Sequence, residues 1–230
     1  MENETTSIEL SGKLLLSVKM QEDTLALELQ LKNNSIQQLT NELVSDNAKK
    51  CFWINLYNSF YQIMVNRSNG NTKGIYKRKE IIIGQVAFSL DEVEHGILRR
   101  SRFKWSFGYL PNPFASQLIT SLGVDQIDYR IHFALNCGAK SCPPIAFYTL
   151  QGIDKQLNEA MYSFILSETA IDHNTNTITT SKILFWYIGD FGGAKGVRKI
   201  ISKVFEMDLT KYTIKYSFYN WEAALYNFKD

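Results

Sequence analysis

The segment that most constrains the fold runs from Cys51 to Arg67 and reads CFWINLYNSFYQIMVNR. Its large apolar residues recur at spacings that form one broad face of an α-helix: Phe52, Trp53, Leu56, Phe60, Ile63 and Met64. Other elements must cover such a face, so we expect this helix to be mostly buried. With 230 residues and 45% hydrophobic content, the chain is long enough to bury it in a large core.

Two asparagines interrupt the apolar character of this helix. Asn55 and Asn58 lie three positions apart and therefore share one side. Asparagine is unfavourable inside a helix because its side chain competes for backbone hydrogen bonds, so both residues are expected to bind a specific partner. They either clamp a neighbouring loop or orient a ligand or a catalytic side chain, and we favour the loop clamp.

Both helical and strand patterns occur along the chain. Leucines separated by polar residues predict amphipathic helices from 8 to 49. Two short apolar runs flank a Gly-Gln pair at 84–85, as in a two-residue hairpin, and alternation at 211–216 predicts a further strand. We therefore expect an α+β fold with a small, mainly antiparallel sheet covered by helices, divided into a helical N-terminal extension (1–48) and a main domain (49–230).

A short helix with a histidine follows the predicted hairpin. Ser89 and Glu92 have the spacing of a capping box at its start. On this helix His95 points away from the apolar side, so it is not a core residue of the helix. It is either an exposed or interdomain histidine, or a base or ligand that faces a cleft, with Glu94 or Asp91 as an orienting carboxylate.

The stretch from Asp128 to Pro144, DYRIHFALNCGAKSCPP, concentrates residues that can carry chemistry. Apolar and polar residues alternate over 129–136, which predicts a strand with His132 on its more polar face. A tight loop containing Cys137 follows and closes on two prolines. A cysteine at the end of a strand is well placed to meet a substrate.

Charge and cysteine content narrow the class of protein. The chain has 25 basic and 23 acidic residues, so no overall field favours a nucleic acid partner, and we expect none. No apolar run approaches the roughly 20 residues needed to cross a bilayer, so we expect no membrane partner. Three cysteines do not suggest a disulfide framework, and the first ten residues are polar and acidic. We expect reduced thiols and a cytoplasmic location.

Four ordered motifs bring these residues together: FWINLYN (52–58), SLDEVEHGILR (89–99), RIHFALNCGAKSCPP (130–144) and YNWEAALYN (219–227). Together they resemble the domain of unknown function 547 family, over roughly 50–227. The resemblance implies that seven residues fall on recurrent motif positions: Asn55, Asn58, Glu94, His95, His132, Cys137 and Cys142. Cys51 departs from the family pattern, which together with its apolar helix indicates a packing cysteine.

We favour a cysteine-dependent hydrolase or acyltransferase that acts on an unknown small-molecule or peptide substrate and needs no cofactor. Cys137 would attack an acyl or amide centre, and because a free thiol has a pKa of about 8.5, His95 or His132 must act as its base. Backbone amides at 138–140 would stabilise the oxyanion, and Asn55 would fix the tautomer of the imidazole.

Two alternatives use the same residues differently. Two histidines and two cysteines, namely His95, His132, Cys137 and Cys142, are a complete tetrahedral ligand set for zinc, which would make them structural. The other alternative is a protein-interaction module in which these residues are buried architecture. In that case the aromatic residues at 105–109 would bind a protein partner.

Overall fold

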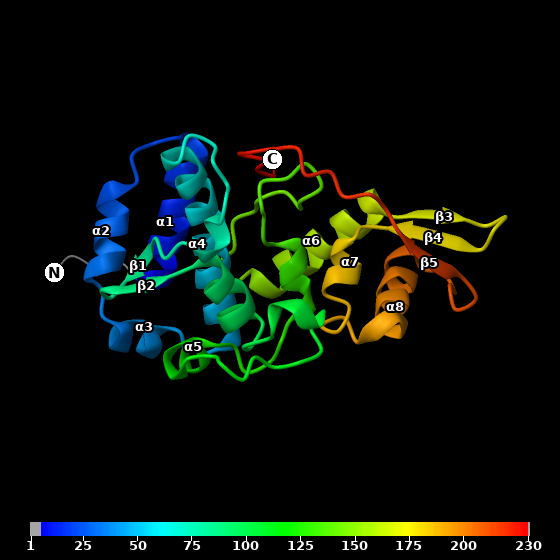
Figure 1. The fold of residues 1–230 in the computed structure, drawn as a ribbon, viewed down its shortest axis with the longest axis horizontal. Helices are drawn as coiled ribbons and strands as arrows, with labels where there is room; N and C mark the ends of the chain where they lie inside the picture. The colour runs from blue at the N-terminus through cyan, green and yellow to red at the C-terminus, as the bar shows by residue number, and fades with distance from the viewer. Residues whose placement is uncertain (1–5, 230) are drawn as a thin grey trace.

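A computed structural model of the chain describes residues 6–229. Figure 1 shows helices α1 to α4 with a small hairpin on one side, and α7, α8 and strands β3 to β5 on the other. Helix α6 lies between them, and the C-terminal segment runs back across the molecule from β5. The expected α+β class is confirmed.

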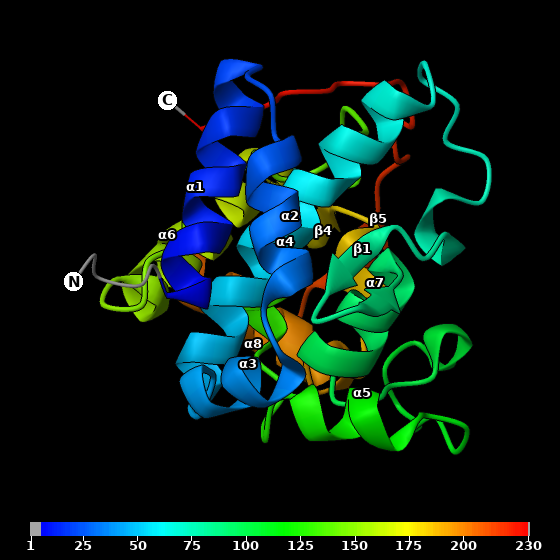
Figure 2. The same cartoon turned by 90° about the vertical axis from the view of Figure 1, so that its left-hand side faces the viewer.

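The N-terminal side is built on one long buried helix. The four helices are α1 (Ser7–Met20), α2 (Leu25–Asn33), α3 (Ile36–Glu42) and α4 (Asp46–Arg67). The predicted apolar face lies on α4, whose residues from Cys51 to Val65 are all buried, so the expectation of a buried helix is confirmed. Helix α1 packs along α4 and covers one side of it (Figure 2).

The hairpin and the capping box are also confirmed. After η1 (Ile75–Lys77), strands β1 (Ile81–Ile83) and β2 (Val86–Phe88) pair antiparallel. Gly84 and Gln85 between them both have positive φ, as the favoured two-residue hairpin turn requires. Ser89 and Glu92 then exchange backbone-to-side-chain hydrogen bonds of 2.9 and 3.2 Å, which leads the chain into η2 (Glu92–Leu98).

The central segment corrects one prediction. It contains η3 (Lys104–Ser106), α5 (Gln117–Leu122) and η4 (Tyr129–Phe133). The strand predicted over 129–136 is wrong, because η4 is a 3₁₀-helix. Residues 131–136 are all buried, so their alternation does not separate a core face from a solvent face, and the Asp128 carboxylate accepts the backbone N–H of Arg130 at the start of the helical turn.

The C-terminal side combines helices with a second sheet. Its elements are α6 (Ile153–Glu168), β3 (Ala170–Asp172), β4 (Thr177–Thr180), α7 (Ile183–Trp186), α8 (Gly193–Phe205) and β5 (Thr213–Tyr216). Strands β3 and β4 are antiparallel, whereas β4 and β5 are parallel. The predicted terminal strand is confirmed as β5, and the strands form two small sheets. Within residues 6–229, no helix is long and apolar enough to cross a membrane.

The buried apolar residues form two clusters. One is centred on α4 and includes the hairpin and η2, while the other joins α6, α7, α8 and β4. The segment from η4 to Cys142 contributes to both, since Ile131 belongs to the first and Phe133 to the second. Side chains from both halves of the molecule therefore meet along this segment.

Candidate functional site

A cavity of about 190 Å³ lies where the two halves meet. Its walls come from α4, η1, η2, η3, η4, α7, the cysteine loop and the C-terminal segment. Clefts between packed units are common binding sites. Five of the residues predicted from the sequence line this one cavity: Glu94, His95, His132, Cys137 and Cys142.

The η2 segment is a π-helix, and it presents two of these side chains. The backbone N–H of Arg99 donates to the carbonyl of Glu94 at 3.0 Å, a bond across five residues. Such wide turns occur frequently at functional sites. His95 is only 8% exposed yet lines the cavity, so of the two alternatives that the sequence left open, the structure places it at a cleft.

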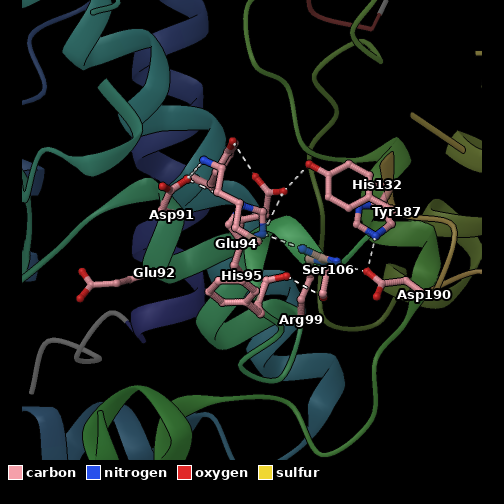
Figure 3. A network of polar contacts seen from close by, with 12 residues as sticks. Asp91, Glu92, Glu94, His95, Arg99, Ser106, His132, Tyr187 and Asp190 are labelled. Atoms are coloured by element: carbon pink, nitrogen blue, oxygen red, sulfur yellow. Dashed lines mark hydrogen bonds and ion pairs between the residues drawn. The ribbon is translucent and has the colours of Figure 1, made fainter. Parts of the chain in front are cut away.

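His95 lies in a polar network, shown in Figure 3. Arg99 Nη1 donates to His95 Nδ1 at 2.7 Å, and His95 Nε2 lies 3.7 Å from Asp91 Oδ1. Lys104 Nζ donates to the same Asp91 oxygen at 2.6 Å. Burial lowers the pKa of His95, with Glu94 opposing and Arg99 adding to that effect. His95 is therefore neutral at pH 7 and accepts a hydrogen bond at Nδ1.

His132 is held by a buried carboxylate (Figure 3). Its Nε2 lies 2.8 Å from Asp190 Oδ2, and Arg99 Nε donates to that oxygen at 2.6 Å. The ring of His132 stacks on Tyr187 with centroids 3.8 Å apart. Burial lowers the pKa of His132, and its hydrogen bond to Asp190 acts against this shift. The pKa of Asp190 lies below its usual range despite burial, because His132 and Arg99 form hydrogen bonds to its carboxylate.

Glu94 is a buried carboxylate that receives two tyrosine hydroxyls. Tyr187 donates to Oε1 at 2.6 Å and Tyr57 to Oε2 at 3.2 Å. Burial acts to raise the pKa of Glu94, but the electrostatic interaction with His95, the hydrogen bond from Tyr187 and the nearby Arg99 outweigh it, so the pKa is lowered. Glu94 therefore carries a negative charge at neutral pH on the cavity wall.

Cys137 and Cys142 form a disulfide, so the expectation that all thiols are reduced is wrong for this pair. The bond lines the cavity, and Cys137 is the more exposed of the two residues. The hydroxyl of Tyr219 lies 3.4 Å from the Cys137 sulfur and 3.1 Å from the Cys142 sulfur. Cys51 is free and buried against the carbonyl of Tyr148, and burial raises the pKa of its thiol to about 12, which supports a packing role.

The two asparagines of α4 clamp loops, as favoured. Asn58 donates to the carbonyl of Ala134 and accepts from the N–H of Asn136, both at 2.9 Å. Asn55 binds both backbone groups of Tyr148, at 2.8 and 3.0 Å. Asn58 therefore fixes the backbone just before Cys137, and Asn55, which was expected to hold an imidazole, is occupied elsewhere.

The predicted oxyanion donors are largely engaged as well. The N–H of Gly138 donates to Asn136 Oδ1 and that of Lys140 to the carbonyl of Glu222, both at 2.8 Å. Within residues 6–229, no group of three or more His, Cys, Asp and Glu side chains is arranged to hold a metal ion. Because the disulfide also uses both thiols, the geometry gives the zinc alternative no support.

Sequence reasoning missed several residues of the site. The basic run at 99–104 is typical of a solvated helix end, yet Arg99 is fully buried. Asp190 and Tyr187 had no predicted role, although an acidic residue between apolar Ile188 and Phe191 was a usable signal. Tyr219 lies in the C-terminal motif, but no sequence pattern around it indicates a chemical role.

Comparison with known proteins found a match to one family model. The family model described as "Protein of unknown function, DUF547" matches residues 41–165, more than half of the chain. This match includes α4, η2, η4 and both cysteines of the cavity, whereas Tyr187, Asp190 and Tyr219 lie beyond it. No curated protein and no solved structure matches the chain.

Proposed function

Since the chain belongs to the DUF547 family, whose description assigns no activity, we propose from the cavity itself a cysteine-dependent hydrolase or acyltransferase. Cys137, once reduced, is the nucleophile and His132 is the general base. One observation carries the proposal: a histidine held by a buried carboxylate shares a cavity with the more exposed cysteine of a reducible pair.

The hydrogen bonds favour one of the two histidines that the sequence left as equal candidates. A neutral imidazole has one N–H and one acceptor nitrogen. We assign the N–H of His132 to Nε2, which faces the Asp190 carboxylate, and this leaves Nδ1 to accept a proton. In His95 the acceptor Nδ1 is already bound by Arg99, so Nε2 carries the proton and the ring has no free acceptor. His132 is therefore the base.

The reaction follows from these assignments. His132 Nδ1 removes the proton of the Cys137 thiol, and the thiolate attacks the acyl carbon of the substrate. The imidazolium returns the proton to the leaving group, and water or another acceptor then cleaves the thioester. Burial raises the pKa of Tyr219, so its hydroxyl stays protonated beside the sulfur and can donate to the developing oxyanion.

The disulfide makes this activity conditional on reduction. Two equivalents of a thiol reductant convert the Cys137–Cys142 bond into two thiols and are themselves oxidised to a disulfide. Only then does Cys137 hold a proton that His132 can remove. A cytoplasmic location, which would supply such reductants, remains part of this proposal.

The disulfide also favours a second candidate, a dithiol–disulfide oxidoreductase. Here Cys137, the more exposed partner, would attack a substrate disulfide, and Cys142 would release the mixed disulfide. The two functions differ in what they require of Cys142. A hydrolase needs it only to protect Cys137, whereas an oxidoreductase needs both sulfurs.

Paired serine variants test the proposal. Cys137→Ser and Cys142→Ser each lose the same cross-link and differ in which thiol remains. Activity is measured with a panel of activated esters, thioesters and peptide amides, with and without dithiothreitol. We expect the wild type to need the reductant, Cys142→Ser to be active without it, and Cys137→Ser to be inactive throughout.

Three other results would redirect the assignment. Full activity of Cys137→Ser excludes this residue as the nucleophile. Loss of disulfide exchange in both variants, with no acyl transfer in either, supports the oxidoreductase instead. His132→Gln retaining wild-type activity, while His95→Gln abolishes it, refutes the choice of base.

A further inference from the structure

Six of the fifteen residues that line the cavity are tyrosines or tryptophans, and the proposed chemistry does not explain most of these rings. They come from α4, η1, α7 and the C-terminal segment: Tyr57, Tyr76, Trp186, Tyr187, Tyr219 and Trp221. Trp186, Tyr219 and Trp221 contact one another with centroids 4.6 to 5.5 Å apart. This three-ring cluster forms one wall, and Trp221, which is 62% exposed, lies at its outer edge.

The charged groups on the cavity wall do not cancel. Asp91 and Glu94 are acidic and Lys104 is basic, and Lys104 is paired with Asp91 at 2.6 Å. Glu94 receives only neutral tyrosine hydroxyls and lies 3.6 Å from His95, which is neutral in the tautomer assigned above. The lining therefore has one uncompensated negative charge, at Glu94.

The residues behind the wall leave this charge in place. Arg99 and Asp190 are fully buried and pair with each other at 2.6 Å, so together they add no net charge. His132, between them and the cavity, has a pKa lowered by burial. A ligand that complements the cavity is therefore cationic.

The chain already holds one ammonium group against an aromatic ring of the cavity wall, that of Tyr76. The Nζ of Lys104 lies 5.4 Å from the ring centroid of Tyr76 and 6.0 Å from that of Trp105. These are distances at which a cation is attracted to the face of an aromatic ring. One ammonium group thus already lies between Asp91 and aromatic side chains at one edge of the cavity, while Glu94 has none.

A larger groove continues from the cavity. It has a volume of about 540 Å³ and shares His95, Lys104, Trp186, Tyr187 and Trp221 with the cavity. Its remaining lining residues are aromatic: Trp105, Phe107 and Phe185. A ligand whose small charged end enters the cavity can lay an apolar arm along this groove.

We propose that the cavity binds an organic ammonium group of the substrate, with the cation between Glu94 and the three-ring cluster and an apolar arm in the groove. This deepens the proposed function and rests on it, since it names the class of acyl compound that would reach Cys137. Cation–aromatic contacts and a buried carboxylate recognise quaternary and protonated amines alike.

Choline and its neutral isostere 3,3-dimethylbutan-1-ol are the probes, because they have the same shape and differ in charge. Binding to the whole chain is followed by tryptophan fluorescence, to which Trp186 and Trp221 at the cavity contribute, and by calorimetry. We expect choline to bind at least tenfold more tightly than the alcohol. Binding is measured on the oxidised wild type, in which the Cys137–Cys142 disulfide blocks catalysis, so a failure of catalysis does not affect this result.

Two pairs of variants locate the binding. Glu94→Gln keeps the shape of the side chain and should weaken choline binding at least tenfold without changing binding of the alcohol, whereas Glu206→Gln, on the surface, should have no effect. Trp221→Leu, which stays informative if the buried Glu94 variant fails to fold, should weaken choline binding. Its control is Phe218→Leu, since Phe218 is 86% exposed and lies outside the cavity lining.

Two outcomes would overturn the inference. Equal affinity for choline and the alcohol, or no binding of choline at all, shows that the cavity does not recognise a cation. Choline binding that is insensitive to both Glu94→Gln and Trp221→Leu places the cation elsewhere. Either result, combined with acyl transfer that depends on Cys137, removes the ammonium inference and leaves the proposed function intact.

Discussion

Asp190→Asn is the substitution whose effect can best be worked out from the structure. Asp190 and Arg99 have fully buried side chains, and their atoms Oδ2 and Nε lie 2.6 Å apart. Asparagine keeps the size and an acceptor oxygen for His132 but removes the charge. The guanidinium of Arg99 is then left buried without its counter-charge, and breaking a buried pair in this way costs about 3–5 kcal/mol.

Urea unfolding measures this cost. With a slope of about 2–3 kcal/mol per molar urea, the midpoint should fall by roughly 1–2 M. The double variant Arg99→Met, Asp190→Asn should be more stable than Asp190→Asn alone, with a coupling of about 1–3 kcal/mol, because it removes the stranded charge. Lys155→Ala, which breaks an exposed pair with Glu159, is the control and should cost less than about 1 kcal/mol.

If Asp190→Asn costs no more than Lys155→Ala, the carboxylate does not carry a charge beside a buried guanidinium. The assignment of the His132 tautomer would then lose its basis, since that tautomer depends on an ionised Asp190 at 2.8 Å.

Two further predictions concern the frame of the site. Asn58→Ala leaves two buried backbone groups in the segment 134–136 unpaired, and each should cost about 1–3 kcal/mol of stability in urea unfolding. The control is Asn41→Ala, at an exposed position, and similar urea midpoints for the two variants would contradict the clamp. The pKa values of His95 and His132 are lowered in the folded chain, so the unfolded chain binds protons first on acidification. Stability should therefore be highest above about pH 6.5 and decline as the pH falls from there toward the lowered pKa values. A urea midpoint that rises as the pH is lowered from 7 to 5 would be inconsistent with neutral buried histidines.

Features set by short-range rules could be predicted from the sequence. The apolar face of α4, the hairpin turn at 84–85 and the Ser89–Glu92 capping box depend on residues a few positions apart, and all three are confirmed. The segment 129–136 failed for a physical reason. Alternation predicts a strand only where one face is solvated, and residues 131–136 are all buried.

The site depends on contacts that no local pattern encodes. Asp190 meets Arg99 across 91 residues and His132 across 58. The sequence identified which residues were able to carry chemistry, and the cavity brings five of them together. The sequence did not indicate that the Asp190 carboxylate binds His132 and not His95. The pairing of Cys137 with Cys142 was also missed, because an odd number of three cysteines suggested free thiols.

Site-resolved alkylation of the native chain across pH tests the central claim most directly. The protein is treated with iodoacetamide before and after reduction, and each cysteine is followed by peptide mass spectrometry. We predict that neither member of the pair reacts before reduction. After reduction Cys137 should react fastest, already at pH values well below the usual thiol pKa of about 8.5, while buried Cys51 should react only on unfolding. If reduced Cys137 reacts no faster than an ordinary thiol, or only when the chain unfolds, His132 does not activate it and the proposed enzyme is refuted.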